Sequence, residues 1–338
     1  MKILKYFIPL LIIACAPGKE TKRDRFFMQG NDALSRQDFD KAVAFYTLSL
    51  ENDPDYARAY NNRGVARIED GHPYEAIQDY NQAILINPEY HDALFNRAYA
   101  YEEVGKYDQA LEDINYLKNT FPDSAFVHFY KGLILTKLRD YPSGIASFKT
   151  SLLLDSMNME ARVNLATLYF FTDRLDSARQ WLRSTLALNP NDANAYNTLS
   201  QIYLSEEDYQ NALITINRAL DIVPQEPYFL NNRGQVYLKM KDYEGALKDI
   251  NKSILLDPSN AWAYRNKGLY HLAQGEFEEA VRLLKEAEKR NQFIDDLYSY
   301  LGEAYLGANQ KDLACESWKK GVELNEERSG KMIIKNCQ

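Results

Sequence analysis

Six prolines recur along this 338-residue chain at a regular interval, with successive gaps of 34, 34, 68, 34 and 34 residues. They are Pro54, Pro88, Pro122, Pro190, Pro224 and Pro258. Because proline lacks a backbone N–H and disfavours helical geometry in the residue before it, each one should end a helix and precede the next. The interval therefore predicts an array of helical hairpins, whereas length alone would suggest two or three compact domains.

Two other positions of the period hold only small residues when nine repeats are counted from Arg23 in steps of 34 residues. Position 8 is Gly30, Gly64, Ala98, Gly132, Ala166, Ser200, Gly234, Gly268 and Gly302, and position 20 is Ala42, Ala76, Ala110, Gly144, Ala178, Ala212, Ala246, Ala280 and Ala314. Position 24 is bulky throughout, from Tyr46 in the first repeat to Trp318 in the ninth. We expect the two helices of each hairpin to approach closely at the small residues, with the bulky side chains filling the seam beside them.

This pattern resembles the tetratricopeptide repeat family over residues 23–328, with no insertion. The resemblance implies an all-α fold, a right-handed α-solenoid superhelix of about nine helix-turn-helix repeats with a concave groove. The repeats would occupy residues 23–56, 57–90, 91–124, 125–158, 159–192, 193–226, 227–260, 261–294 and 295–328, and residues 329–338 would form a short C-terminal cap or tail. A cap is expected because the last hairpin of a solenoid otherwise exposes its apolar face.

The fourth repeat departs most from the pattern. Gly144 takes position 20, Ser156 replaces the periodic proline, and Pro142 enters the second helix near its start. Proline is tolerated in a first turn, whereas glycine inside a helix costs about 1 kcal/mol relative to alanine. Two interpretations are open, which are neutral sequence drift and a local softening between two halves of the array.

The N-terminal residues have the composition of an export signal, with two lysines before a short apolar run. The run is about half of the ~20 residues that a membrane-spanning helix needs, so a signal peptide over residues 1–14 is expected. Residues 12–15 read Ile-Ile-Ala-Cys and resemble a bacterial lipobox. This resemblance implies cleavage before Cys15, lipidation of that cysteine, and a lipidated tether over residues 15–22. The alternative is an ordinary signal that happens to contain a cysteine.

The residue after the cysteine, Ala16, is not an aspartate, which in enterobacterial sorting resembles targeting to the outer membrane. The expected location is therefore the bacterial cell envelope, with the chain lipid-anchored at the outer membrane and facing the periplasm. That compartment is oxidising, so Cys315 and Cys337 could form a disulfide if the cap folds back over the last repeat. Two separate thiols are the alternative, and both remain open at this point.

In the family that this sequence resembles, the first helix of each hairpin lines the groove with positions 2, 5, 6, 9, 12 and 13. Asparagines at positions 5 and 6 are Asn61, Asn62, Asn96, Asn164, Asn197, Asn231, Asn232 and Asn266. Because an amide both donates and accepts hydrogen bonds, such a row can bind the backbone of an extended peptide of any sequence. The row resembles the asparagine ladder of the O-GlcNAc transferases; the alternative is that these side chains simply face water.

Aromatic side chains fall on the same surface, and Phe95, Tyr99 and Phe129 are candidate anchors for a bound peptide. Aromatic rings would also suit stacking against sugars. Packing between neighbouring helices is a third interpretation.

The residue pattern indicates neither catalysis nor a metal site. The four histidines have no histidine or cysteine partner at metal-ligand spacing, no glycine-rich phosphate loop occurs, and no acidic pair is singled out for acid–base chemistry. The formal net charge of −8 gives no electrostatic footprint for nucleic acid. We therefore expect no enzyme activity, cofactor, metal or small-molecule substrate.

A long groove without reactive chemistry is typical of a binding surface. The expected function is a membrane-anchored periplasmic scaffold or adaptor that binds envelope proteins or extended peptides in the groove. The alternative is a glycan- or peptidoglycan-binding envelope lipoprotein.

Overall fold

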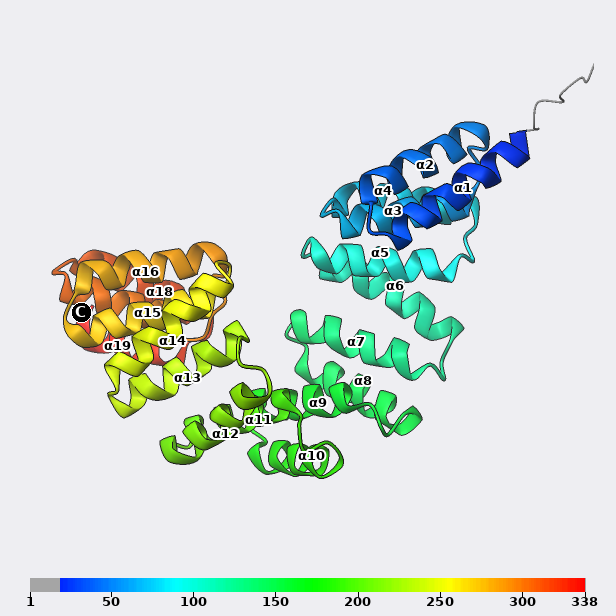
Figure 1. The fold of residues 1–338 in the computed structure, drawn as a ribbon. Coiled ribbons are helices and arrows are strands. Elements are labelled where there is room, and N and C mark those ends of the chain that lie inside the picture. The colour runs from blue at the N-terminus through cyan, green and yellow to red at the C-terminus, as the bar shows by residue number, and fades with distance from the viewer. Residues whose placement is uncertain (1–18, 338) are drawn as a thin grey trace, which may run out of the picture. The chain divides into compact units, whose positions relative to one another are not determined.

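A computed structural model describes residues 19–337, in which nineteen helices and no strand are present (Figure 1). Contacts divide the chain into two compact units, of which the first ends at Met157 and the second begins at Asn158. The first unit contains α1 (Lys19–Ser35), α2 (Phe39–Asn52), α3 (Ala57–Glu69), α4 (Pro73–Ile86), α5 (His91–Glu103), α6 (Tyr107–Thr120), α7 (Ala125–Lys137) and α8 (Tyr141–Leu154). The boundary between the units therefore follows the fourth hairpin, in which Ser156 takes the place of the periodic proline.

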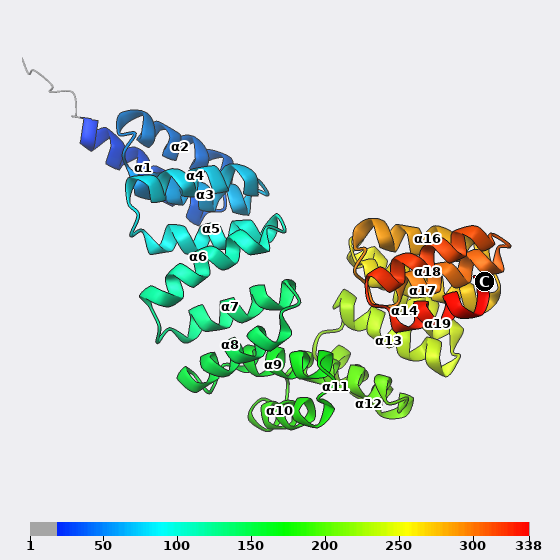
Figure 2. The same ribbon diagram turned by 180° about the vertical axis from the view of Figure 1, so that it is seen from behind.

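The second unit contains eleven helices (Figure 2). They are α9 (Met159–Phe171), α10 (Leu175–Leu188), α11 (Ala193–Ser205), α12 (Tyr209–Ile222), α13 (Pro227–Met240), α14 (Tyr243–Leu256), α15 (Ala261–Gln274), α16 (Phe277–Arg290), α17 (Leu297–Gly307), α18 (Lys311–Glu323) and α19 (Glu327–Asn336). Helices α1 to α18 pack in consecutive pairs, which form nine helical hairpins, and α19 follows them. The predicted all-α architecture of paired helices is confirmed.

Helix starts follow the 34-residue period from α3 to α15. In each of these repeats, the first helix begins at position 1. Local capping explains several of these starts. The side chains of Asn158, Asp192 and Asn260 each accept a hydrogen bond from the backbone N–H three residues later. The ends of the array differ: α1 begins at Lys19, before the expected start, and α17 begins at Leu297, after Asp296 in a left-handed conformation.

The small residues at position 8 lie directly under the bulky side chains at position 24. A Cβ atom added to Gly30 would lie 2.5 Å from the ring of Tyr46, and one added to Gly302 would lie 2.2 Å from the indole of Trp318. Both rings are fully buried. The expected close approach of the two helices is confirmed, and the glycine provides the space that the ring occupies.

Within each unit, the first helices of successive hairpins touch one another. These contacts join α1 to α3 and α3 to α5 in the first unit, and they run from α9 through α17 in the second. The second helices of successive hairpins make no comparable contact in the described residues. The first helices therefore lie on the inner side of each unit, and we call their exposed surface the inner face.

The C-terminal helix α19 packs on α17 and α18, as expected for a cap. A disulfide joins Cys315 of α18 to Cys337 at the end of α19, with their Cα atoms 5.8 Å apart. The Glu326 carboxylate, at the N-terminus of α19, accepts hydrogen bonds from the backbone N–H groups of Tyr298 and Ser299. The cap thus closes the last hairpin through a covalent bond and a buried polar contact.

The proposed signal over residues 1–14, Cys15 and the first residues of the proposed tether lie outside the described residues. Among the helices that are described, none combines the length and the apolar composition that crossing a membrane requires.

Candidate functional site

In the first unit, asparagine side chains form a hydrogen-bonded relay from one hairpin to the next. Asn96 Nδ2 donates to Asn61 Oδ1 at 3.0 Å, and Asn61 Nδ2 donates to Asn62 Oδ1 at 3.1 Å. Asn62 Nδ2 in turn donates to Asn31 Oδ1 at 3.0 Å, where the hydroxyl of Tyr46 also donates. The relay therefore connects three consecutive hairpins through side-chain amides.

The second unit contains a matching relay that begins at a buried arginine. Arg265 Nη2 donates to Asn266 Oδ1 at 2.9 Å, and Asn266 Nδ2 donates to Asn231 Oδ1 at 2.8 Å. Asn231 continues to Asn232 at 3.2 Å, and Asn232 ends the relay on Asn197 Oδ1 at 2.8 Å. The direction of donation, from later to earlier hairpins, is the same in both units.

These relays correct part of the sequence interpretation. Asn231 and Asn266 are 2% and 0% exposed, so the prediction that they line a peptide-binding groove is wrong, whereas Asn61 is 6% exposed and borders the inner face only at the polar hollow described below. Their amides are buried between hairpins, where an unpaired polar group would be costly, and each is satisfied by the neighbouring asparagine. Of the relay asparagines that the sequence analysis assigned to the groove, Asn62, Asn96, Asn197 and Asn232 remain half-buried and reach the inner face. Asn164 joins neither relay, because its Nδ2 donates to the backbone carbonyl of Glu160 in its own helix.

Phe129 is also misassigned by the sequence analysis. Its side chain is 7% exposed and its ring lies 5.8 Å from that of Phe148 in the core of the fourth hairpin. The physical reason is that position 5 is buried in most hairpins, as Asn61, Asn231 and Arg265 at the same position show. Phe129 therefore stabilises the hairpin and is not an exposed anchor.

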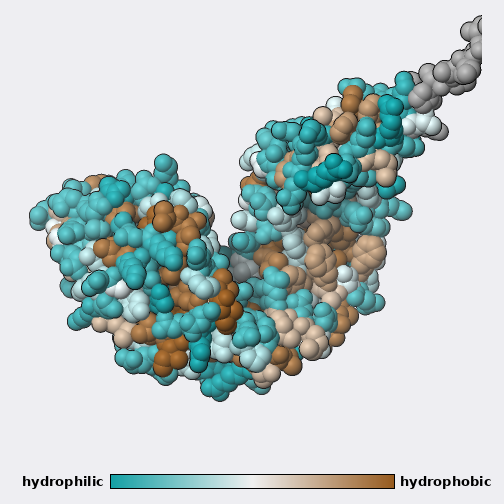
Figure 3. Space-filling model, in the orientation of Figure 1, coloured by the Kyte–Doolittle hydropathy of each residue, from teal (hydrophilic) through white to brown (hydrophobic). Residues whose placement is uncertain are grey.

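Phe95 and Tyr99 do reach the surface, and Phe95 packs against two further rings, the exposed Phe126 and the buried Tyr130. The Phe95 ring centroid lies 5.0 Å from that of Phe126 and 4.9 Å from that of Tyr130. Phe126 is 54% exposed and Tyr99, one turn after Phe95 on α5, is 41% exposed. We call Phe95, Tyr99, Phe126 and Tyr130 the aromatic patch. Exposed hydrophobic side chains gather in such patches on both units (Figure 3).

Sequence reasoning missed Phe126 as a surface residue and Tyr130 as the buried ring beneath it, although a signal was present. They occupy positions 2 and 6 of the fourth repeat, which are inner-face positions in the family pattern. Reading these positions as columns across all repeats would have found both rings.

Carboxylates surround the aromatic patch. The hydroxyl of Tyr130 donates to Glu102 at 2.6 Å, and burial together with this carboxylate raises the pKa of Tyr130. Burial, followed by the charges of Glu103 and Glu69, also raises the pKa of the Tyr99 phenol. Glu69 and Glu103 are exposed, and neither forms an ion pair with a cation of the described residues. The patch is therefore both aromatic and negatively charged.

A shallow polar hollow of about 500 Å³ lies beside the patch on the inner face. It is lined by Ala57, Arg58, Asn61, Asn62, Asn87, Tyr90 and Asp92. Burial first, and then the nearby Asp92 carboxylate, raises the pKa of the Tyr90 phenol. The Arg58 guanidinium lies 5.2 Å from the centre of the Phe27 ring, so the main cation of the hollow already has an aromatic partner.

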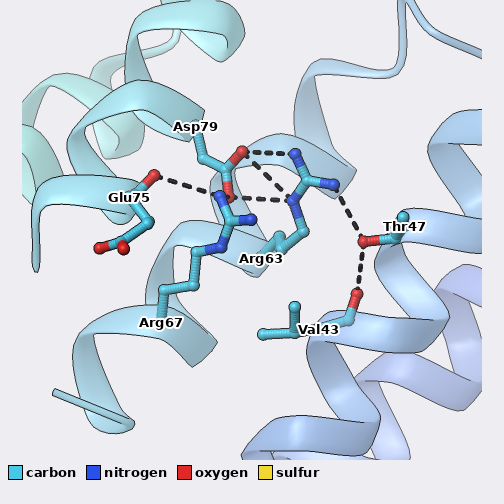
Figure 4. A network of polar contacts seen from close by, with 6 residues as sticks. All are labelled: Val43, Thr47, Arg63, Arg67, Glu75 and Asp79. Atoms are coloured by element: carbon cyan, nitrogen blue, oxygen red, sulfur yellow. Dashed lines mark hydrogen bonds and ion pairs between the residues drawn. The ribbon is translucent and has the colours of Figure 1, made fainter. Parts of the chain in front are cut away.

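Beneath the inner face, half-buried arginines paired with buried aspartates connect neighbouring hairpins. Figure 4 shows Arg63 and Arg67 of α3 converging on Asp79 of α4, with Arg63 also reaching Thr47 of α2. The Arg63–Asp79 contact is 2.6 Å long, and Asp79 is 2% exposed. This network joins the two helices of one hairpin and also bonds to the hairpin before it.

The same arrangement recurs twice more. Arg97 bonds to Asp113 at 2.6 Å and to Asn81 of the preceding hairpin at 2.7 Å. Arg233 likewise bonds to Asp249 at 2.6 Å and to Asn217 at 2.9 Å. The recurring partners occupy positions 7 and 23 of one repeat and position 25 of the repeat before it. The sequence analysis missed these bridges, although the paired columns were visible in the sequence.

Five sequence models of tetratricopeptide repeats match the chain, at residues 57–90, 79–112, 135–202, 199–254 and 228–292. Together they span most of the helical array. The chain belongs to the tetratricopeptide repeat family. No curated protein sequence matches it.

Solved tetratricopeptide-like structures support the fold. The APC/C heterotetramer Cut9–Hcn1 aligns with a TM-score of 0.60 at 20% identity, covering 85% of this chain and 56% of that one. A tetratricopeptide repeat protein from Parabacteroides merdae aligns with a TM-score of 0.50 at 19% identity, covering 84% and 99% of the two chains. Pseudomonas aeruginosa pilF aligns with a TM-score of 0.52 at 18% identity, covering 65% and 100%. This chain thus spans little more than half of the Cut9–Hcn1 chain, and all three likenesses concern the fold.

The tetratricopeptide array is therefore a repeat scaffold of the kind that mediates protein–protein interaction. Over residues 19–337, no three histidine, cysteine, aspartate or glutamate side chains gather in a group that could hold a metal ion. The features that the array presents for recognition are the aromatic patch, the polar hollow and the half-buried relay amides.

Proposed function

We propose that this protein is a membrane-anchored scaffold of the bacterial envelope that holds extended segments of partner proteins on its inner face. The observation that carries the proposal is that polar contacts connect the hairpins internally while aromatic rings stay exposed on the inner face. Arginine bridges and buried amides connect the hairpins internally. Tyr99 and Phe126, in contrast, expose large parts of their rings at the surface. An exposed aromatic surface beside hydrogen-bonding amides suits peptide binding.

The proposed location is the periplasmic side of a bacterial membrane, with the outer membrane as the specific expectation. The lipobox-like Ile-Ile-Ala-Cys at residues 12–15 supports lipid attachment at Cys15. The disulfide between Cys315 and Cys337 supports an oxidising compartment, because such bonds persist outside the cytosol. Envelope proteins or extended peptides are the proposed partners, and the scaffold is proposed to act without catalysis.

The anchor can be tested by membrane fractionation of cells that express the full chain. Replacement C15A should move the protein from the membrane fraction to the soluble fraction, because the lipid attachment is lost. The matched control is the double variant C315A/C337A, which removes two cysteines elsewhere and should stay with the membrane. Retention of C15A in the membrane would refute the anchor.

The binding role can be tested by photo-crosslinking in the same cells. A photoreactive residue at Trp262 on the inner face should capture discrete envelope proteins, and the same residue at Leu255 on a second helix should not. Leu255 is more exposed than Trp262, at 79% against 37%, so absence of capture at Leu255 would not reflect poor access. Equal capture at both positions, or capture of glycan alone, would contradict the scaffold proposal.

A further inference from the structure

We infer that the aromatic patch and its carboxylates form a docking surface for an extended, basic peptide segment, in which lysine or arginine lies close to aromatic or aliphatic residues. The inference rests on the proposed scaffold function and deepens it by stating the chemistry of the partner.

The apolar part of the surface comes from two adjacent helices. Phe95 of α5 contacts both Phe126 and Tyr130 of α7, and the rings of Phe126 and Tyr130 are stacked with centroids 6.3 Å apart. Tyr99 extends the surface by one turn along α5 and is exposed. The exposed ring of Phe126 is held by Phe95 and by the buried Tyr130, so it loses little conformational entropy when a partner binds.

The charged part of the surface is negative on both sides of the rings. Glu103 follows Tyr99 by about one helical turn on α5, and Glu69 is the last residue of α3, which contacts α5. After burial, their charges raise the pKa of the Tyr99 phenol. Glu102 accepts a hydrogen bond from the hydroxyl of Tyr130, which orients that ring. Asp92, three residues before Phe95, adds a further exposed carboxylate at the rim of the polar hollow.

The nearby cations do not neutralise these carboxylates. Lys131 follows Tyr130 but occupies position 7, whose side chains turn towards the second helices, as Arg63 and Arg97 do. Burial and the neighbouring Lys118 lower the pKa of Lys131. Arg58 lies over the Phe27 ring at the other side of the hollow. No ion pair within the described residues therefore satisfies Glu69, Glu103 or Asp92.

Charge complementarity selects the occupant of this surface. A lysine or arginine gains both from the carboxylates and from the negative faces of tyrosine and phenylalanine rings, whereas an acidic peptide is repelled. The net charge of −8 over the whole chain adds long-range attraction for a basic partner. A segment that carries basic and apolar residues close together can place its apolar side chains on the rings and its basic side chains on the carboxylates around them. The half-buried amides of Asn62 and Asn96 are available for the peptide backbone.

Three fluorescein-labelled peptides test the inference by fluorescence anisotropy with the full chain. Each contains two phenylalanines flanked by lysine, by glutamine or by glutamate, and is otherwise identical. The lysine peptide should bind at least about tenfold more tightly than the glutamate peptide at low salt, and added salt should reduce that preference. Equal binding of all three peptides would overturn the inference.

Paired variants locate the binding. The double variant Y99A/F126A should weaken binding of the lysine peptide by about tenfold or more at every salt concentration. Its matched control is Y74A/Y116A, which removes two exposed rings from second helices of the same unit, α4 and α6, and should leave binding unchanged. Circular dichroism would verify that both variants are folded. An equal effect of the two double variants would place the binding elsewhere and contradict the inference.

Charge variants separate the carboxylates from the rings. E69Q/E103Q should weaken binding of the lysine peptide several-fold at low salt and have little effect at high salt. The control E244Q/E278Q makes the same change in net charge on exposed residues of second helices and should leave binding almost unchanged. If E69Q/E103Q binds the lysine peptide as tightly as the unaltered chain, the acidic role is refuted. That failure would not affect the scaffold proposal, which depends on the fractionation and crosslinking results.

Discussion

The guanidinium of Arg63 on α3 lies 2.6 Å from the carboxylate of Asp79 on α4, and the carboxylate is almost completely buried. Arg67 donates to the same carboxylate at 2.7 Å, so a single aspartate compensates two arginines. Because a buried charge is tolerated only when it is paired, this aspartate decides whether the second hairpin can keep both arginines in place.

Asp79→Ala should therefore destabilise the second hairpin severely. Removal of one partner leaves uncompensated buried charge, at a cost on the order of 3–5 kcal/mol. Hydrogen exchange of α3 and α4 and the thermal midpoint would measure the effect. Glu279→Ala is the control, because its pair with Arg282 is exposed and should contribute at most about 1 kcal/mol. Comparable losses for the two variants would contradict the structural role assigned to Asp79.

Asn231→Ala should interrupt the relay of the second unit at its centre. The substitution leaves Asn266 without an acceptor and Asn232 without a donor, at a cost of roughly 1–3 kcal/mol for buried polar groups. Asn164→Ala should cost much less, because this half-buried amide bonds only to its own helix. Thermal denaturation of both variants gives the comparison, and equal midpoints would argue against a stabilising relay.

Gly302→Ala should destabilise the last hairpin, because the new methyl group would lie 2.2 Å from the indole nitrogen of Trp318. Overpacking of this kind costs typically about 1–3 kcal/mol. Gly330→Ala is the matched control, since its nearest neighbour would be 3.8 Å away and alanine favours a helix by about 1 kcal/mol. Opposite shifts of the thermal midpoint are expected for the two variants.

Reduction of the disulfide between Cys315 and Cys337 should loosen α19. The bond closes a loop with a sequence separation of 22 residues, for which chain entropy predicts a stabilisation of about 3 kcal/mol. Hydrogen exchange in α18 and α19 should rise with dithiothreitol, while exchange in α3 and α4 stays constant. Unchanged exchange in α19 would indicate that Glu326 and the packing hold the cap without the bond.

Asp296→Asn should stabilise the protein at neutral pH. Burial, and secondarily Glu326, raises the pKa of the Asp296 carboxyl. An acid with a raised folded-state pKa favours folding at low pH and loses that contribution as pH rises through the folded pKa, so the ionised form is a cost at neutrality. Relief of such charge strain is worth roughly 0.5–2 kcal/mol. The gain in thermal midpoint should vanish below the ordinary aspartate pKa; a gain independent of pH would contradict this account.

The array of hairpins could be predicted from the sequence because its causes are local. Periodic prolines and small residues at positions 8 and 20 determine where helices end and where they touch, and the structure places Gly30 under Tyr46 accordingly. The functional surface was harder to predict, because it depends on which neighbour a side chain meets. Asn61 and Asn62 are adjacent in sequence, yet one is buried between hairpins and the other reaches the inner face.

The arginine bridges were also hard to predict from the sequence, because their partners are distant along the chain. Arg97 meets Asn81 and Asp113 at sequence separations of 16 residues, one backwards and one forwards. In the sequence, each of these three polar residues is typical of an ordinary surface position. Only the three-dimensional stacking of hairpins shows that the three form one contact, which is buried at Asp113 and exposed at Asn81.

The asparagine relay also makes the order of the hairpins matter. Asn61 accepts from Asn96, and Asn231 accepts from Asn266, so a hairpin with asparagine at position 5 requires a successor with asparagine at position 6. Hairpins that look interchangeable by their period are therefore not free to trade places. Duplication, deletion or shuffling of modules would be tolerated best at joints that the relay does not cross, and the evolution of the array's length is constrained accordingly.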